Sequence, residues 1–482
     1  MILRIISLLF GLFLLSTCQE TPRAAADRIR WLPGSTFVED FTQYSGFLSA
    51  NDTLNGVTAQ FHYWLVMAKQ SVQNAPLIVW LNGGPGCSSL SGLFVENGPF
   101  RPSQDGKQLN ENVYAWNRFS NVLYLESPAG VGFNPQTSTT WDDAKVAQAN
   151  YFALNDFFTV YPDAGKNGVF LSGEGYASVY VTTLGNVIAD NISAGKNTIN
   201  LQGILIGNGL LSIRKHYNAM IEFSYAKGMN FKEDFDNLTA TCCGNDSSPM
   251  NCDYYSYDFQ NSDCGKMAYA FYTKLQKPEV DPYNIYQECY QLAKNQASAN
   301  EFYGLELAAN YNSSDPFDGF PCFAEDAITN YLQRADVQSE IHVLADQQKP
   351  IQWRSCSTLT NYGQQQSGDI SIALGRLVNS LIWRQNNLRL LLYNGDLDLS
   401  SNHVGAQWFV EALNQQALTN GGDWRFSLND SLYVGSTGGY YKSFDRQITF
   451  ATIKGAGHFV PLSRPAQILQ LVRNFVTNST IA

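Results

Sequence analysis

Short, fully apolar runs alternate with longer amphipathic stretches over the first half of the chain. Uninterrupted runs rich in β-branched residues are typical of strands that are buried on both faces of a parallel sheet. The amphipathic stretches between them, residues 144–162 and 176–191, predict helices. The apolar runs are APLIVWLN (75–82), NVLYLES (121–127), GVFLSGE (168–174) and LQGILIGN (201–208).

The same alternation returns near the C-terminus, with LRLLLYNG (388–395), QITFATIKG (447–455) and a closing helix that begins at Pro465. In that helix Ile468, Leu471, Val472 and Phe475 follow the spacing of one apolar helix face. Strands and helices in this order predict an α/β fold. Ligands of such a fold bind at the carboxyl ends of its strands.

The middle of the chain, residues 210–350, does not follow this pattern. It is rich in Tyr, Asn and Asp, lacks long apolar runs, and contains most of the cysteines. We therefore expect an insertion that forms a disulfide-rich cap over the carboxyl edge of the sheet. The expected organisation is a signal peptide (1–18), the first part of the core (19–209), the inserted cap (210–350) and the second part of the core (351–482).

The N-terminus carries one positive charge at Arg4 and then an apolar run from Ile5 to Leu15. This run is shorter than the roughly 20 residues that a bilayer-spanning helix needs, so a signal peptide is favoured over a membrane anchor. With a net charge of -11 and no cluster of basic residues, the chain is not expected to bind nucleic acid. We expect a protein that is secreted or lysosomal and is not membrane-bound after signal removal.

The cysteines and the N-glycosylation motifs agree with a secreted or lysosomal protein. Apart from Cys18, the cysteines form an even set, which in an oxidising compartment predicts four disulfides. Buried free thiols are the alternative, and composition alone does not choose among the possible pairings. Motifs for N-glycosylation occur at Asn51, Asn191, Asn237, Asn245, Asn312, Asn429 and Asn478.

Three segments that follow predicted strands require a joint explanation: GEGYAS (173–178), NGDLD (394–398) and GAGHFVP (455–461). Their order is that of the α/β-hydrolase triad, in which an elbow comes first, an acid second and a histidine last. His458 taken alone would more often be structural. In this order, Asp398 is expected to orient His458 as a base.

A fourth segment, WLNGGPGCSS (80–89), directly follows a predicted strand. Consecutive glycines allow backbone N–H groups to turn toward a shared point, as an oxyanion hole requires. Alone, a turn rich in Gly and Pro would be weak evidence. Together with the other three segments, it favours a site for acyl chemistry.

With these four segments, and with ENGPF (96–100) and WNRFSNVLYLESPAGVGF (116–133), the sequence resembles the serine carboxypeptidases from about Pro33 to the C-terminus. The resemblance implies an α/β-hydrolase fold with a mixed, mostly parallel sheet and helices on both faces. It also implies a site that receives the C-termini of peptides or proteins, with no cofactor and no metal.

The resemblance also assigns roles to individual residues. Asp398 and His458 are the acid and the base, and the N–H groups of Gly84 and Tyr176 form the oxyanion hole. The residues that receive the terminal carboxylate are Trp80, Asn82, Glu96 and Glu174. The implied disulfides are Cys87–Cys356, Cys242–Cys264, Cys243–Cys252 and Cys289–Cys322.

The two acidic residues of this set suggest a dependence on pH. Neighbouring carboxyl groups do not both ionise readily, so Glu96 and Glu174 are expected to share a proton. The protonated member can donate a hydrogen bond to a carboxylate, which would favour binding at acidic pH. Two separate, solvated surface acids are the alternative.

The sequence departs from its family at the elbow. The family pattern G-E-S-Y-A-G is here G-E-G-Y-A-S, so the nucleophile position is Gly175 and has no side chain. Glycine relieves the strained backbone of an elbow. We do not expect any nearby hydroxyl to replace the missing one, whether from Ser172, from Ser178 or from the pair Ser88 and Ser89.

Three functions are compatible with this pattern. The first is a carboxypeptidase-like protein that binds peptide C-termini with absent or much weakened peptidase activity. The second is a functional serine-type carboxypeptidase that acts at acidic pH, by an unexpected hydroxyl or by direct attack of water. The third is a structural or interaction protein on an inherited scaffold.

Overall fold

The computed structural model describes most of the chain beyond the predicted signal peptide. The described residues are 20–52, 56–69, 74–196, 199–244, 252–256, 258, 260–275, 280–287, 297–302, 305–308, 324–344, 349–357, 359, 362–363, 368–427 and 435–481. The predicted signal peptide, Cys289, Cys322 and the glycosylation motifs at Asn245, Asn312 and Asn429 lie outside them.

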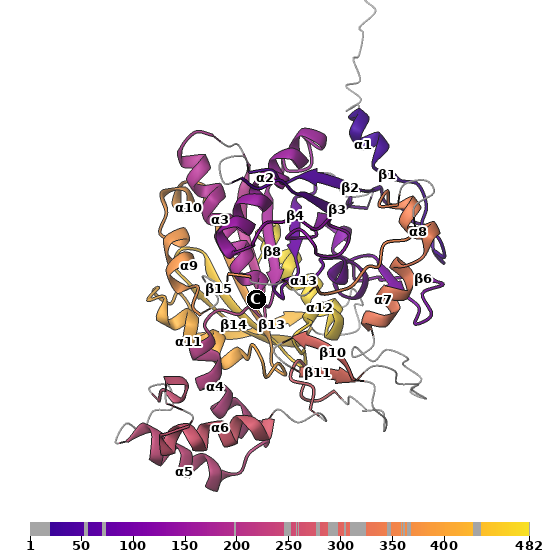
Figure 1. Cartoon of the computed structure of the whole chain (residues 1–482). Coiled ribbons are helices and arrows are strands. Elements are labelled where there is room, and N and C mark those ends of the chain that lie inside the picture. The colour runs from indigo at the N-terminus through magenta and orange to yellow at the C-terminus, as the bar shows by residue number, and fades with distance from the viewer. Residues whose placement is uncertain are drawn as a thin grey trace, which may run out of the picture.

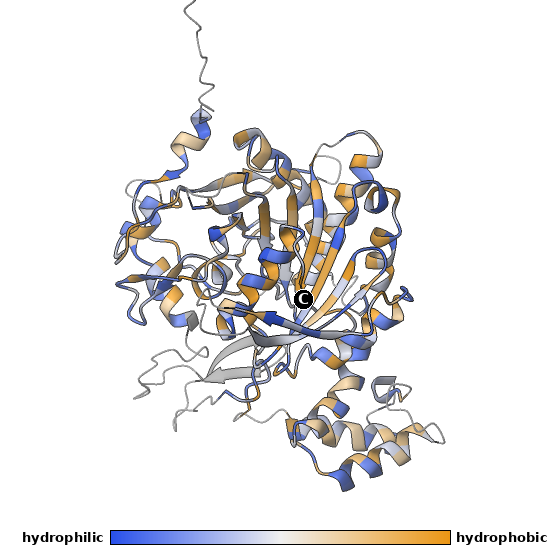
Figure 2. Ribbon diagram, turned by 180° about the vertical axis from the view of Figure 1, so that it is seen from behind, coloured by the Kyte–Doolittle hydropathy of each residue, from blue (hydrophilic) through white to orange (hydrophobic). Residues whose placement is uncertain are grey.

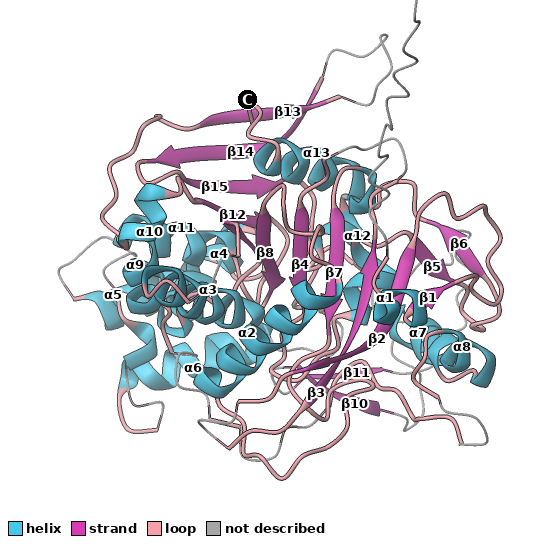
Figure 3. Ribbon diagram, turned by 90° about the horizontal axis from the view of Figure 1, so that it is seen from above, coloured by secondary structure: helices cyan, strands magenta, loops and turns pink. Residues whose placement is uncertain are grey.

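Among the described residues, the centre of the molecule is one sheet of eleven strands, in the order β1-β2-β3-β7-β4-β8-β9-β12-β15-β14-β13 (Figure 3). The central strands from β7 to β15 are parallel, and the strands toward both edges are antiparallel. The strands are β1 (Arg28–Ile29), β2 (Gln43–Ser49), β3 (Gln60–Val66), β4 (Leu77–Leu81), β7 (Asn121–Leu125), β8 (Val169–Glu174), β9 (Leu201–Gly207), β12 (Arg389–Gly395), β13 (Gly422–Phe426), β14 (Ser436–Phe444) and β15 (Ile448–Ile453).

Helices surround this sheet, and two small hairpins in the described part of the chain lie outside it. The α-helices are α1 (Pro22–Ala26), α2 (Asp143–Val160), α3 (Ala177–Ser193), α4 (Ile213–Ala226), α5 (Lys232–Cys243), α6 (Asp263–Leu275), α7 (Ala324–Leu332), α8 (Ala335–Glu340), α9 (Ser371–Val378), α10 (Leu381–Gln385), α11 (His403–Ala412), α12 (Val460–Ser463) and α13 (Pro465–Val476). Shorter turns are η1 (Gly92–Glu96), η2 (Trp116–Arg118) and η4 (Tyr254–Ser256). The hairpins are β5 (Phe100–Pro102) with β6 (Leu109–Glu111), and β10 (Ala297–Phe302) with β11 (Leu305–Ala308).

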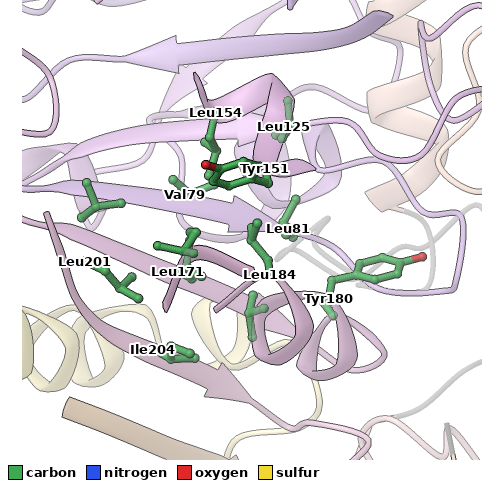
Figure 4. Close-up of a cluster of buried hydrophobic side chains, with 14 of the residues drawn as sticks. Val79, Leu81, Leu125, Tyr151, Leu154, Leu171, Tyr180, Leu184, Leu201 and Ile204 are labelled. Carbon is green, nitrogen blue, oxygen red and sulfur yellow. The ribbon is translucent and has the colours of Figure 1, made fainter. Parts of the chain in front are cut away.

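Each central strand buries side chains on both faces, as its uninterrupted apolar run predicts. In β4, Val79 belongs to the core under α2 and α3, whereas its neighbour Trp80 belongs to the core on the opposite face, under α13. Figure 4 shows the first of these cores, where Leu171 of β8 and Leu184 of α3 lie among other aliphatic side chains. Because both faces of each central strand are packed, the end of the strand has a fixed position, and so do the residues that directly follow it.

The insertion leaves the sheet after β9 and returns at β12. Its helices α5 and α6 form a lobe that projects from the sheet, at the lower left of Figure 1. Cys242 and Cys264 lie in the small apolar cluster of this lobe. Figure 2 shows apolar strands at the centre of the molecule and mixed colours over this lobe, which agrees with its polar composition.

The last part of the predicted insertion packs on the core. Tyr331 of α7 is fully buried and joins the core cluster under α13, where its ring lies 5.6 Å from that of Phe94. Ile341, just after α8, accepts a hydrogen bond from Ser45 of β2 through its carbonyl. By its contacts, therefore, the stretch from α7 to residue 344 belongs with the core, and the cap-like part of the insertion precedes it.

Three of the implied disulfides are present: Cys87–Cys356, Cys242–Cys264 and Cys243–Cys252. Of the glycosylation motifs within the described ranges, Asn51, Asn237 and Asn478 are exposed, and Asn191 is half-buried. In the part of the chain that the structure describes, no helix has both the length and the apolar character required to cross a membrane.

Candidate active site

The carboxyl ends of three strands bring the predicted acid, base and elbow together. Asp398 follows β12, His458 follows β15, and Gly175 follows β8. The Asp398 Oδ2 atom lies 2.8 Å from His458 Nδ1, and both side chains are almost fully buried. This contact assigns the proton of the neutral ring to Nδ1, which leaves Nε2 as a hydrogen-bond acceptor.

Asp398 is held in place by its own set of donors. The amide of Asn208 donates to its Oδ2 over 2.7 Å, and the backbone N–H groups of Ser400 and Ser401 donate to its Oδ1 over 2.9 and 3.2 Å. Asn208 ends the β9 run, and its other amide atom accepts from Gly395 N. Sequence reasoning missed this residue, although a polar residue directly after a buried strand was a usable signal.

Gly175 lies at the apex of the elbow with φ +59°, a conformation that side chains rarely adopt. A Cβ built on it would lie 3.1 Å from His458 Nε2 and 3.6 Å from Cε1. Apart from its chain neighbours, no other described atom comes within 4 Å of that position. The imidazole is therefore the one described group beyond the chain neighbours that a side chain at position 175 would meet at its Cβ, in a tight contact.

Three of the serines considered as substitutes form hydrogen bonds away from the imidazole. Ser178 Oγ donates to the carbonyl of Leu210 over 2.9 Å, and Ser89 Oγ donates to the carbonyl of Leu125 over 2.7 Å. Ser88 Oγ donates to the buried carboxylate of Glu126. Ser172 is fully buried within β8. The expectation that none of them faces the imidazole agrees with these contacts.

The glycine-rich loop after β4 packs directly on the elbow. A Cβ on Gly83 would come within 2.7 Å of both Glu174 O and Tyr176 N, so only glycine permits this approach. Gly84 follows with φ +115° and Gly86 with φ +104°. The loop thus places the backbone of Gly83, the residue before Gly84, against Tyr176 at the start of α3.

Helix α3 contributes to the electrostatics of this point. It begins directly after the elbow, and no side chain caps its N-terminus. The first turn of a helix carries a partial positive charge, which stabilises an anion placed there. The arrangement suits a negatively charged oxygen at the predicted oxyanion hole.

The predicted carboxylate receptors form one buried group. Trp80 Nε1 donates to Asn82 Oδ1 over 2.7 Å, and Asn82 Nδ2 donates to Glu96 Oε1 over 3.1 Å. The carboxyl groups of Glu96 and Glu174 are both buried, and they lie close enough for each to shift the pKa of the other. The structure therefore brings together all four residues, and it excludes the alternative of two separate surface acids.

Burial and mutual repulsion decide how this acidic pair titrates. Burial, and then the charge of Glu96, raise the pKa of Glu174 well above its ordinary value. Burial also raises the pKa of Glu96, but hydrogen bonds from Asn82 and Glu174 oppose that rise. Glu174 is therefore the member of the pair that retains its proton to higher pH.

A segment of the insertion, residues 280–287, contacts the base and the backbone on either side of the acid. The carbonyl of Tyr283 accepts a hydrogen bond from His458 N over 2.7 Å, and the Tyr283 ring lies 4.7 Å from the imidazole. On the other side, Leu399 N donates to Pro282 O over 2.9 Å. Sequence reasoning missed Tyr283, because nothing in its local pattern indicates a contact with a segment so distant in the chain.

We expect Tyr283 to position the imidazole. In a Gly175→Ser background, Tyr283→Ala should lower kcat about 3- to 10-fold with little change in KM, because an aromatic contact contributes about 0.5 to 1.5 kcal/mol. Tyr283→Phe keeps the ring and should behave as the parent. Steady-state kinetics on one peptide substrate checks this, and equal losses in both variants would contradict it.

In the described ranges, no cluster of His, Cys, Asp and Glu is arranged to hold a metal ion. The combination of acid, base, elbow and oxyanion loop on a mostly parallel sheet defines the α/β-hydrolase class. The crystal structure of Kex1(delta)p, a prohormone-processing carboxypeptidase from Saccharomyces cerevisiae, has this fold. It superposes with a TM-score of 0.72 at 21% identity and covers 94% of this chain and 96% of that chain.

Sequence comparison identifies the family within the α/β-hydrolase class. The profile of the serine carboxypeptidases, Peptidase S10, matches residues 33–478. The lysosomal protective protein of Mus musculus is 34% identical over 500 residues, covering 98% of each chain. Serine carboxypeptidase ctsa-4.1 of Caenorhabditis elegans is 34% identical over 489 residues, covering 96% of this chain and 95% of the relative. This chain belongs to the serine carboxypeptidase family.

Proposed function

We propose that this protein is a receptor for peptide C-termini, in which the acyl-enzyme route of its family is closed. Residue 175 occupies the nucleophile position of the family motif and is a glycine. The observation that carries the proposal is that a residue without a side chain faces the base: a Cβ on Gly175 would lie 3.1 Å from His458 Nε2. Removing a triad serine typically costs on the order of a millionfold in turnover.

The binding half of the site supports the same proposal. The chain from Trp80 through Asn82 to the Glu96–Glu174 pair is intact and buried. A carboxylate that enters it exchanges water for a protonated carboxyl group and an amide donor, and hydrogen bonds to charged groups are stronger than those between neutral groups. Recognition of a C-terminus needs these groups but does not need the nucleophile.

We place the protein in the secretory or lysosomal route. The apolar N-terminal run, the disulfides and the similarity to a protein named for the lysosome support this placement. An acidic compartment would also suit the raised pKa of Glu174, which keeps the receptor protonated there.

Two measurements test the receptor proposal. Calorimetric titration near pH 5 should show binding of a peptide with a free C-terminus and much weaker binding of the same peptide with an amidated C-terminus. A fluorophosphonate probe should not label the protein. Equal affinity for both peptides, or no binding at all, would instead favour a structural or interaction role.

A functional carboxypeptidase is the second candidate. The intact contact of 2.8 Å between Asp398 and His458 favours it, because a receptor does not require an oriented base. This function predicts release of amino acids from N-blocked dipeptides at a rate close to that of a Gly175→Ser variant. A probe-labelled hydroxyl would support it directly.

Peptide affinity should fall as pH rises. Because the pKa of Glu174 is raised, this carboxyl group stays protonated and donates at acidic pH, and it becomes a repelling charge as pH increases through that raised value. Uptake of one proton limits the slope to about tenfold in affinity per pH unit. Titration calorimetry over a series of pH values measures it.

Glu174→Gln is the matched variant for this prediction. The amide keeps a donor and cannot ionise, so its affinity should depend less on pH and should exceed that of the natural protein at neutral pH. An unchanged pH profile in Glu174→Gln would show that another group controls binding.

A further inference from the structure

A buried carboxylate, Glu126, contacts the loop that carries the carboxylate receptors. Glu126 directly follows β7 and is fully buried, as is its partner His62 of β3. The Nδ1 atom of His62 lies 2.8 Å from Glu126 Oε2. Removing charged groups from water is costly unless they are paired and hydrogen-bonded, so the contacts of this pair show what it holds in place.

Two partners of Glu126 can only donate hydrogen bonds to it. Trp353 Nε1 donates to Oε1 over 3.2 Å, and the backbone N–H of Phe133 donates to Oε2 over 3.0 Å. An indole N–H and a backbone N–H cannot accept, so both oxygens of the carboxyl group must accept. An amide side chain has a single oxygen and therefore cannot replace the carboxylate here.

The contacts of His62 determine where its protons lie. Ser45 Oγ gives its single proton to the carbonyl of Ile341 over 2.7 Å, so it accepts from His62 Nε2, which lies 2.8 Å away. Because two acceptors cannot share a contact of 2.8 Å, one further proton lies between His62 Nδ1 and Glu126 Oε2. The pair is therefore neutral as a whole and hydrogen-bonded at both ring nitrogens, which allows its burial.

Ser88 connects this pair to the receptor loop, which comprises residues 82–96. The Ser88 Oγ atom donates to Glu126 Oε1 and accepts from Leu90 N over 3.1 Å. The carboxylate thus fixes the hydroxyl group, and the hydroxyl group fixes the backbone that leads into the next turn. Two consecutive hydrogen bonds therefore link the buried pair to the loop.

The turn that follows Leu90 positions two of the carboxylate receptors. It runs from Gly92 to Glu96 and so contains one of them. The N–H of Gly92 donates to Asn82 Oδ1 over 3.1 Å, and a Cβ on Gly92 would lie 2.9 Å from that oxygen. A displacement of Leu90 would therefore change the positions of Asn82 and Glu96.

We propose that Glu126, paired with His62, is a positioning residue of the receptor for peptide C-termini and acts through Ser88. This inference rests on the proposed function, because it assigns to Glu126 the alignment of Asn82 and Glu96 for a terminal carboxylate. The alignment serves the carboxylate rather than the rest of the peptide. Loss of the link should therefore reduce the preference for a free C-terminus over an amidated one.

Ser88→Ala tests the link directly. Calorimetric titration near pH 5, with a peptide that has a free C-terminus and with the same peptide amidated, gives the ratio of the two affinities. In Ser88→Ala we expect this ratio to fall about tenfold, the scale of one hydrogen bond to a charged group, while the affinity for the amidated peptide stays the same. A Ser88→Ala protein that keeps the ratio of the natural protein would overturn the proposal.

Ser45→Ala is the matched control, because it removes a hydroxyl group from the far end of the same hydrogen-bonded series. It leaves His62 Nε2 without its acceptor, so the unfolding temperature should fall, but the affinity ratio should not change. Equal falls of the ratio in Ser45→Ala and Ser88→Ala would show that general loss of stability weakens binding, and a positioning role would then be wrong.

Glu126→Gln tests the carboxylate itself. Its amide places an N–H group against the N–H of Trp353 or of Phe133, so the ratio should fall at least as far as in Ser88→Ala. Combining the two substitutions should cause no further fall, because both break one link, and additive effects would contradict the shared path. Ser88→Ala, which leaves the buried pair in place, decides the question if Glu126→Gln does not fold.

The outcomes separate this inference from the function on which it rests. A natural protein that prefers the free C-terminus, with the same preference in Ser88→Ala, would refute the role of Glu126 and leave the receptor proposal intact. A natural protein without that preference would refute the receptor proposal and this inference with it.

Discussion

A single substitution, Gly175→Ser, is expected to produce an efficient carboxypeptidase. The acid and base are in contact, the oxyanion loop lies against the elbow, and the carboxylate receptors are connected. Because a triad serine contributes on the order of a millionfold to turnover, a gain of at least about a thousandfold is expected on N-blocked dipeptides near pH 5. Steady-state kinetics measures it as kcat/KM.

The gain should come at some expense of stability. Residue 175 has φ +59°, where a side chain costs on the order of 1 to 3 kcal/mol. The new Cβ would also lie 3.1 Å from His458 Nε2, so the ring must move by a few tenths of an ångström. Thermal unfolding should therefore show a less stable but active variant.

Gly175→Ala is the control for Gly175→Ser, because it has the same backbone strain and the same Cβ but no hydroxyl oxygen. It should share the loss of stability and gain no peptidase activity. If Gly175→Ser were no faster than Gly175→Ala, some part of the site besides the nucleophile would also be out of place, and the proposed origin of the weak activity would be wrong.

The parts of the fold and site that follow from local pattern could be predicted from sequence. Double-sided apolar runs indicated the parallel strands, and their ends placed Asp398 and His458 together, since the carboxyl ends of parallel strands meet at one edge. The pairing of Glu96 with Glu174 came from family resemblance. In each case the residues concerned lie in short motifs that can be recognised locally in the sequence.

The parts that depend on contacts between distant segments could not be predicted. Tyr283 lies in the insertion yet packs on His458, and Tyr331 lies in the same insertion yet is buried in the core. Their immediate neighbours in the sequence do not distinguish these two environments. Asn208 could be predicted only in part. Its position directly after a strand is visible in the sequence, but its hydrogen bond to Asp398 is not.

The second large effect is expected on removal of the disulfide Cys87–Cys356. It joins residues 269 apart in the sequence and closes the largest loop of the three described disulfides. In the chain-entropy account, a loop of this size corresponds to about 5 kcal/mol. The double variant Cys87→Ser, Cys356→Ser should therefore unfold at a temperature lower by about 5 °C or more.

The same variant should also weaken the site, because this disulfide belongs to the loop that packs on the elbow. Ser88 N donates to Ser355 O over 2.7 Å and Ser357 N donates to Gly86 O over 2.9 Å, so both sides of the disulfide fasten the oxyanion loop. Without the covalent link, the backbone of Gly84 is held less firmly. In a Gly175→Ser background, we expect kcat to fall by about tenfold or more, since about 1.4 kcal/mol of lost transition-state stabilisation corresponds to that factor.

The lobe provides a matched control. Cys242–Cys264 joins residues only 22 apart and lies in the separate apolar cluster of α5 and α6. Its removal should cost about 3 kcal/mol and lower kcat much less, because the acid, the base, the elbow and the oxyanion loop lie outside that cluster, which approaches the site through Leu399. Equal losses of kcat in the two double variants would mean that global destabilisation, rather than release of the oxyanion loop, limits the reaction.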